Sequence, residues 1–194
     1  MGYFIAVEGL DGIGKSTLVQ NLAETFSGHS MSTPGDSLCD IRKVVLNDFS
    51  DDELAKALFY TASVSSQGKK ARKMAESGVW VFMDRYWDST IAYAKARGVT
   101  ANLEYLSEIL LPPDLTVLLL LDESERQRRL HARGATAEDM ETLDPGFRQS
   151  VLDELQARAS LVVDISGYEP LAATQMLEKA IREKIKSTTC YVLT

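Results

Sequence analysis

The sequence predicts an α/β fold in which a parallel five-stranded sheet is covered by helices on both faces. Two observations lead to this prediction. Short, continuously apolar runs recur along the chain, which is typical of parallel strands buried on both faces. Stretches of helical character separate most of these runs, and such alternation indicates a three-layer sandwich. Residues 1–194 carry no linker, repeat or low-complexity segment, so a single domain is expected.

Turn and cap residues mark the ends of the elements expected in the first half of the chain. Thr33–Asp36 contains Pro and Gly and is expected to be a loop. Asp51 and Asp52 suit a helix N-cap, and Gly78 suits the end of that helix. The expected elements are a strand at Tyr3–Val7, a helix at Ser16–Phe26, a short strand at His29–Ser32, a helix at Ser37–Leu46, a long helix from Asp52 to Glu76 and a strand at Val79–Met83.

Prolines divide the second half of the chain in the same way. Pro112 and Pro113 end the helices that follow Tyr86, and Pro145 suits the first position of a helix. The remaining expected elements are a central strand at Leu115–Leu121, an Arg-rich helix after Asp122, a weakly patterned stretch at Ala135–Leu143, a helix from Asp144 to Ser160, a strand at Leu161–Ile165 and a helix at Pro170–Lys186. The tail Ser187–Thr194 has no assigned place.

Composition and charge exclude several classes of partner. The formal net charge of −7 argues against a nucleic-acid polymer, which would favour a basic stripe. Cys39 and Cys190 form neither a disulfide framework nor a zinc pair, and the two histidines add no metal-binding cluster. The apolar run Leu115–Leu121 is too short to span a membrane, and no basic leader precedes the first strand. A soluble, cytoplasmic protein is therefore expected.

The segment Gly9–Ser16 matches the phosphate-binding pattern G-x-x-x-x-G-K-[ST] without a mismatch. It lies between an expected buried strand and a helix, so its N–H groups can converge on a phosphate at the helix N-terminus. Lys15 is expected to bridge the β- and γ-phosphates of ATP, and the Ser16 hydroxyl to hold Mg²⁺. The pattern predicts a P-loop NTPase fold with the ATP-binding residues Gly9, Gly12, Gly14, Lys15, Ser16 and Thr17.

Asp11 is unusual because a carboxylate inside an anion-binding loop opposes the purpose of that loop. One interpretation is that it holds a sugar hydroxyl or a water on Mg²⁺. The other is that it only shapes the loop through an Asx-turn.

A second group of polar residues follows the strand expected at Val79–Met83. Asp84 and Arg85 lie at its carboxyl end, where ligands bind in open parallel sheets. Asp84 is expected to hold Mg²⁺ through water, and Arg85 to fork onto a phosphate. Ser89 and Tyr93 are expected on the same face of the following helix. The alternative interpretation is a strand end with a surface salt bridge.

Three segments together resemble bacterial thymidylate kinases: VEGLDGIGKST, DRYWDSTIAYAKARG and LDESERQRRLHARG. The resemblance spans nearly the whole chain. It implies a nucleoside monophosphate kinase fold with a lid at about residues 124–143. It also implies ATP-dependent phosphorylation of a deoxynucleoside monophosphate, either thymidylate or a related pyrimidine nucleotide, with Mg²⁺. Members of the family are usually homodimers, so a homodimer is expected.

The resemblance also assigns roles around the acceptor nucleotide. It implies that Arg85 binds the acceptor phosphate, that Asp11 meets the sugar and that Tyr93 crowds its 2′ position. Phe59 is implied as the aromatic residue that stacks on the base. The expected substrate-binding set is Asp11, Phe59, Arg85, Ser89, Thr90 and Tyr93.

The lid segment carries three arginines on what is expected to be one helix face. Arg126, Arg129 and Arg133 are spaced i, i+3 and i+7, a pattern that by itself is usually a solvated surface. Gly12 places the chain with the family members that supply catalytic arginines from the lid. The resemblance then implies that Arg129 and Arg133, with Lys15, Asp11 and Arg85, serve catalysis and that Arg126 contacts ATP.

The base-reading part of the resemblance is weaker. Ser63 stands where the family has an arginine that reads the thymine edge, and the loop at Ser32–Asp36 lacks the family's charged pair. Thr90 replaces the usual asparagine or serine, and a second lid arginine is missing near Met140. A site that loses a hydrogen-bonding reader changes or relaxes its specificity. Two other arginines are candidates for the reading role: Arg72 and Arg97.

Three other functions remain open from the sequence. A kinase of a nucleoside or another hydroxyl acceptor needs a general base, for which Glu8 or Asp84 would serve. A GTPase-like switch would usually carry an NKxD guanine reader, which this sequence lacks. The third is a degenerate homologue that binds nucleotide without turnover.

Overall fold

The computed structural model describes residues 1–191, except the side chains at positions 39, 137, 138 and 188–191. Five strands form one parallel sheet in the order β2-β3-β1-β4-β5, which confirms the predicted fold class. The strands are β1 Phe4–Glu8, β2 His29–Ser32, β3 Val81–Asp84, β4 Leu115–Leu120 and β5 Leu161–Asp164. The helices are α1 Lys15–Thr25, α2 Asp36–Asp48, α3 Glu53–Glu76, α4 Trp87–Ala96, a 3₁₀ helix at Leu103–Glu108, α5 Glu123–Arg133, α6 Ala137–Glu141, α7 Pro145–Arg158 and α8 Pro170–Tyr191.

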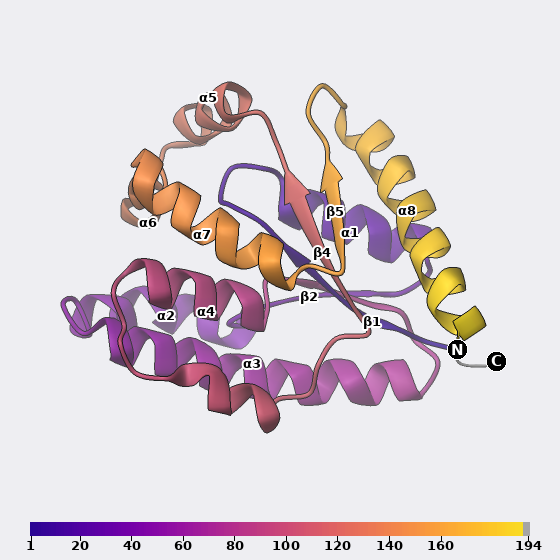
Figure 1. Cartoon of the computed structure of the whole chain (residues 1–194), viewed down its shortest axis with the longest axis horizontal. Coiled ribbons are helices and arrows are strands. Elements are labelled where there is room, and N and C mark those ends of the chain that lie inside the picture. The colour runs from indigo at the N-terminus through magenta and orange to yellow at the C-terminus, as the bar shows by residue number, and fades with distance from the viewer. Residues whose placement is uncertain (192–194) are drawn as a thin grey trace.

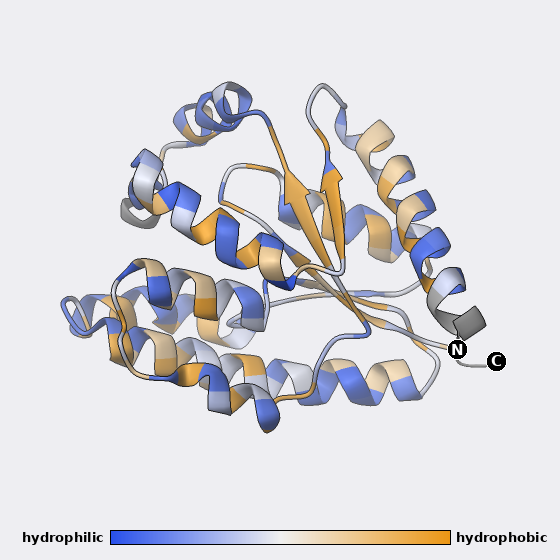
Figure 2. Ribbon diagram, in the orientation of Figure 1, coloured by the Kyte–Doolittle hydropathy of each residue, from blue (hydrophilic) through white to orange (hydrophobic). Residues whose placement is uncertain are grey.

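Helices cover both faces of the sheet (Figure 1). Helices α1 and α8 pack together on one face, and α3, α4 and α7 cover the other. Strand β1 explains the two layers, because its successive side chains point to opposite faces. Ile5 and Val7 belong to the apolar cluster that includes α1 and α8, whereas Phe4 and Ala6 belong to the cluster with α3 and α4. Figure 2 shows β4 and β5 mostly in the orange of hydrophobic residues, whereas the edge strand β2, with the sequence HSMS, is more polar.

Most element boundaries differ from the sequence predictions by one or two residues. Strand β3 begins at Val81 rather than at Val79, because the amide of Val79 donates to the carbonyl of Met74 at the end of α3. The weakly patterned stretch contains the short helix α6, which begins at a capping box of Thr136 and Asp139. Helix α8 continues past Lys186 into the unassigned tail, and residues 192–194 of that tail lie outside the described residues.

Candidate active site

The P-loop connects β1 to α1 at the carboxyl end of the sheet. Gly12 and Gly14 have φ angles of 88° and 93°, a backbone region that favours glycine. A side chain at position 12 would also collide with α5, since an added Cβ would lie 2.8 Å from Leu130 Cγ and 3.2 Å from Arg126 Cγ. The loop therefore packs directly against the lid helix, and glycine is required there for both conformation and space.

Lys15 occupies the centre of the loop. Its side chain is buried, and Nζ donates a hydrogen bond of 2.7 Å to the carbonyl of Leu10. Burial, together with the positive charge of Arg85, lowers the pKa of Lys15 to about 8. Asp11 Oδ1 lies 3.9 Å from Nζ, and a triphosphate placed in the loop would add further negative charge beside this ammonium.

Ser16 and Asp84 meet because β1 and β3 are adjacent strands. Ser16 Oγ donates to Asp84 Oδ2 at 2.5 Å. The other carboxylate oxygen, Asp84 Oδ1, is enclosed and accepts no hydrogen bond from the described residues. An enclosed carboxylate oxygen beside a hydroxyl fits a hard cation such as Mg²⁺. The side chains that the structure describes form no cluster of three or more metal ligands, so phosphates and waters would have to complete such a site.

Arg85 lies at the end of β3 in a left-handed conformation with φ 64°, which is uncommon for a residue with a side chain. The Thr33 hydroxyl donates 2.8 Å to the carbonyl of Arg85. Its guanidinium lies 2.7 Å from Asp11 Oδ1 and donates 2.9 Å to Ser89 Oγ. Burial alone would raise the pKa of Asp11, but Arg85 and Lys15 hold it well below its ordinary value. The Asp11 carboxylate therefore orients a buried, charged arginine.

Glu8 holds the turn that follows Arg85. It is fully buried, and its carboxylate accepts hydrogen bonds from the amide of Tyr86 at 2.8 Å and from the Ser89 hydroxyl. Burial and the nearby Asp88 carboxylate raise the pKa of Glu8 to about 7. Sequence reasoning named Glu8 only as a possible general base. Its buried contacts indicate a positioning role, which no spacing signal in the sequence reveals.

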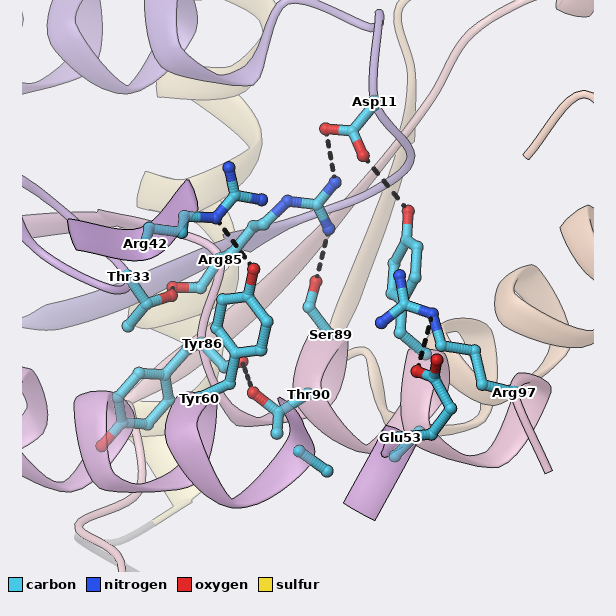
Figure 3. A pocket seen from close by; sticks show the side chains of 13 residues that line it. Asp11, Thr33, Arg42, Glu53, Tyr60, Arg85, Tyr86, Ser89, Thr90 and Arg97 are labelled. Atoms are coloured by element: carbon cyan, nitrogen blue, oxygen red, sulfur yellow. Dashed lines mark hydrogen bonds and ion pairs between the residues drawn. The ribbon is translucent and has the colours of Figure 1, made fainter. Parts of the chain in front are cut away.

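A pocket opens beside Arg85 between α3 and α4 (Figure 3). Five of the residues expected to bind substrate line it: Asp11, Arg85, Ser89, Thr90 and Tyr93. Tyr93 OH donates a long hydrogen bond of 3.5 Å to Asp11 Oδ2, and its ring lies under the guanidiniums of Arg85 and Arg97. Burial raises the pKa of Tyr93 to about 12, so the phenol stays protonated.

At the α3 wall of the pocket, the residues observed differ from the residue that the sequence predicts. The residues of α3 that line it are Glu53, Ala57 and Tyr60, whereas Phe59 is absent from the lining. The spacing 53, 57 and 60 marks one helix face, and residue 59 is rotated about 100° away from residue 60. Ser63 Oγ donates to the carbonyl of Phe59 at 3.1 Å and also lies outside the lining.

Of the two arginines considered as alternative readers of the base, only one lines the pocket. Arg72 binds Asp114 at 2.9 Å and the carbonyl of Pro112 at 2.6 Å, away from the pocket. Arg97 lines the pocket, and so does Arg42, which donates 2.8 Å to Tyr60 OH. Arg42 is a pocket residue that the sequence reasoning missed.

The three lid arginines occupy different environments rather than one functional face. Arg126 is fully buried, and its guanidinium donates to the carbonyls of Asp11 at 3.0 Å and Thr142 at 2.9 Å. Arg129 donates 3.1 Å to the carbonyl of Ile13 in the P-loop. Arg133 pairs with Asp139 at 2.7 Å, and its side chain is 52% exposed. Arg126 and Arg129 thus both contact the phosphate-binding loop, Arg126 from a buried position that bridges the loop and the lid, whereas Arg133 pairs with Asp139 inside the lid.

Comparisons with known proteins give one consistent family. The family model described as "Thymidylate kinase" matches residues 7–185. A thymidylate kinase from Exiguobacterium sibiricum is 33% identical over 98% of this chain and 96% of its own length. A probable thymidylate kinase from Pyrococcus abyssi is 39% identical over 71% of this chain and 74% of its own length. The solved structure of the Candida albicans thymidylate kinase has a TM-score of 0.75, with 24% identity, and covers 94% of this chain and 92% of that one. Among residues 1–191, no helix combines the length and apolarity needed to cross a membrane.

Proposed function

We propose residue roles and a mechanism from the premise that the chain belongs to the thymidylate kinase family. It is a nucleoside monophosphate kinase that transfers a phosphoryl group from ATP to thymidylate, giving thymidine diphosphate and ADP. The roles below concern how this chain's residues carry out that reaction.

One observation supports these roles above all others, namely the placement of Arg85. A buried guanidinium between Asp11 and Ser89 faces the pocket on one side and lies close to the P-loop on the other. A phosphate on Arg85 would therefore lie next to the γ-phosphate that Lys15 binds. We assign Arg85 to the acceptor phosphate and Lys15 to the β- and γ-phosphates of ATP.

The reaction needs positioning and charge neutralisation rather than a general base. The acceptor phosphate oxygen is already ionised at neutral pH, so it attacks the γ-phosphorus without losing a proton, and the bond to the β-phosphate oxygen breaks. Lys15 and Arg129 neutralise the charge that develops on the transferring group and the leaving ADP. Arg133 joins them when the lid moves inward and Asp139 releases it.

The nucleoside alternative gains no support from the pocket. A hydroxyl acceptor needs a base to remove its proton. The Glu8 carboxylate is buried under Tyr86 and Ser89, and Asp84 is bound to Ser16. Glu8 is thus engaged by its own hydrogen bonds, and Asp84 is assigned to Ser16 and Mg²⁺ rather than to an acceptor hydroxyl.

Mg²⁺ is assigned to Ser16 and Asp84. The enclosed, unpartnered Asp84 Oδ1 and its proximity to the Ser16 hydroxyl support this assignment. When held by Ser16 and Asp84, the ion would neutralise part of the phosphate charge of ATP.

The remaining roles follow from the pocket walls. Asp11 and Tyr93 are assigned to the sugar, with Tyr93 disfavouring a 2′-hydroxyl. Tyr60 replaces Phe59 as the aromatic wall for the base, because Tyr60 lines the pocket. Arg126 is assigned to positioning, since its donors already bind the P-loop and the lid. We also propose a single domain with a lid at about residues 124–143, a homodimer and a cytoplasmic location.

A coupled ADP-release assay tests the function. With ATP and thymidylate we expect turnover that requires Mg²⁺ and both nucleotides. ADP release that does not depend on thymidylate would identify an ATPase and reject the proposal. Gel filtration with light scattering tests the homodimer, which a monomer mass at assay concentration would reject.

A further inference from the structure

The wall of the pocket farthest from the P-loop carries a pair of charged residues with no assigned role. Helix α4 turns Ser89, Tyr93 and Arg97 toward the pocket at four-residue intervals. At 1.5 Å per residue, Arg97 lies about 12 Å from Ser89 along the helix. Because Arg85 and Ser89 mark the phosphate end, the base of a bound nucleotide would extend toward Arg97. Glu53 of α3 faces Arg97 there (Figure 3).

Among the described residues, only one of the two Glu53 carboxylate oxygens has a partner within hydrogen-bonding distance. Oε1 lies 2.6 Å from Lys56 Nζ. Oε2 lies 3.6 Å from Arg97 Nε, which is too long for a hydrogen bond, and it accepts none from the described residues although it is enclosed. An enclosed carboxylate oxygen without a donor is unfavourable, so a ligand that donates a hydrogen bond to Oε2 would remove this cost.

Arg97 is held in place from the lid side. Its Nε and Nη2 donate to Glu141 at 3.2 and 2.6 Å. Glu141 is the last residue of α6, so the lid fixes the guanidinium beside Glu53. The pair thus presents a negatively charged acceptor next to a positively charged group.

A base edge that complements such a pair carries an N–H next to an acceptor. Followed in the same direction round the ring, thymine offers N3–H and then O2, and cytosine offers the N4 amine and then N3, one ring position earlier. An arginine alone would only donate, so it would favour carbonyl oxygens and oppose the cytosine amine. With Glu53 present, the cytosine amine has a hydrogen-bond acceptor, because a carboxylate accepts from an amine as readily as from a ring N–H.

We propose that Glu53 Oε2 accepts a hydrogen bond from the pyrimidine edge, that Arg97 positions it, and that the pocket therefore accepts deoxycytidylate as well as thymidylate. The proposal rests on the proposed function, because it requires the acceptor phosphate on Arg85. Glu53 becomes the residue that sets the breadth of base recognition.

The test compares three acceptors that differ only in the base: thymidylate, deoxycytidylate and the deoxyribonucleotide of 2-pyrimidinone, whose base edge has no N–H. For the unmodified enzyme, kcat/KM for deoxycytidylate should lie within about tenfold of that for thymidylate. Glu53→Ala should lower both values about tenfold or more, but change the 2-pyrimidinone value less than about threefold.

Two further variants control the test. Glu53→Gln keeps an acceptor oxygen and the side-chain size, so it should show the same dependence on the base with a smaller loss, and it serves if Glu53→Ala does not fold. Glu76→Gln, an exposed glutamate at the other end of α3, should change none of the three values.

Equal losses for all three acceptors would indicate a structural role and overturn the proposal, as would no loss with either variant. Deoxycytidylate more than about a thousandfold poorer than thymidylate would also overturn it. If no acceptor is phosphorylated, the proposed function fails by itself. Calorimetric binding of the same three nucleotides then tests Glu53, with the same dependence on the base expected.

Discussion

At the phosphate end of the pocket, the functional groups are buried and contact one another over short distances. Lys15 is hydrogen-bonded within its own loop, and Arg85 is held by Asp11 and Ser89. At the base end, the wall includes long side chains from α2, α3 and the end of α4, and Arg97 is also ion-paired to Glu141 of α6. A preorganised charge cluster tolerates few changes, whereas long side chains on separate helices can be exchanged at small cost. Substitutions should therefore lose less activity as they move from the phosphate end to the base end.

Lys15→Ala should cause the largest loss. Removing one charge that stabilises a transition state typically lowers kcat by about 10²–10³-fold. Lys70→Ala, on the exposed face of α3, is the matched control and should keep wild-type turnover. Circular dichroism should show both variants folded. Wild-type turnover in Lys15→Ala would mean that the P-loop does not bind the transferring phosphate.

Arg85→Ala should cause the next largest loss of activity, and the loss should appear as a higher KM for the acceptor nucleotide. Losing a charge-assisted hydrogen bond costs about 1.5–3 kcal/mol, which corresponds to a rise in the acceptor KM of about tenfold to a hundredfold. Asp11 would also lose its partner, so its pKa would rise. The KM for ATP should change little. Collapse of ATP affinity, with the acceptor KM unchanged, would move Arg85 to the donor site.

Substitutions in the lid should cause intermediate losses of activity, and the two lid arginines Arg129 and Arg133 should differ in how much they lower kcat. Arg129→Ala should lower kcat about tenfold or more, because this residue already contacts the P-loop carbonyl of Ile13. Arg133→Ala should lower kcat less, since its guanidinium is half exposed and paired with Asp139. Steady-state kinetics with saturating nucleotides would distinguish them. An equal or greater loss for Arg133 would mean that lid movement, not proximity in this structure, decides which arginine acts.

The same contrast explains what the sequence could predict. The phosphate end consists of contiguous motifs whose residue types indicate the chemistry, so the sequence could nominate the P-loop and the segment after β3 for the proposed roles. The sheet followed from the continuous apolar runs. Strand and helix ends were less accurate because single hydrogen bonds decide them, as at Val79.

Two features could not be predicted, because one depends on partners distant in the sequence and the other on the rotation of a helix about its axis. Arg126 looked like a lid cation, but carbonyls of Asp11 and Thr142 take its donors, and no spacing reveals those contacts. The pocket face of α3 depended on the rotation of a helix, where an error of one residue turns a side chain by about 100°. The sequence therefore predicts Phe59 at this wall, whereas the pocket lining contains Tyr60.

The smallest expected effect tests this exchange at the base end. Tyr60 lines the pocket and accepts a hydrogen bond from Arg42, whereas Phe59 lies outside the lining and packs edge-on against Tyr60 with ring centroids 5.4 Å apart. Aromatic contacts contribute about 0.5–1.5 kcal/mol, so Tyr60→Ala should raise the acceptor KM roughly threefold to tenfold. Tyr60→Phe keeps the ring and should keep most of the affinity. Phe59→Ala should leave the acceptor KM unchanged, because the side chain that it truncates does not reach the pocket. The reverse result, with a raised KM only in Phe59→Ala, would restore Phe59 as the stacking residue. It would also mean that α3 rotates when the acceptor binds. The small losses of activity on substitution at the base end would then result from the mobility of α3 rather than from exchangeable side chains.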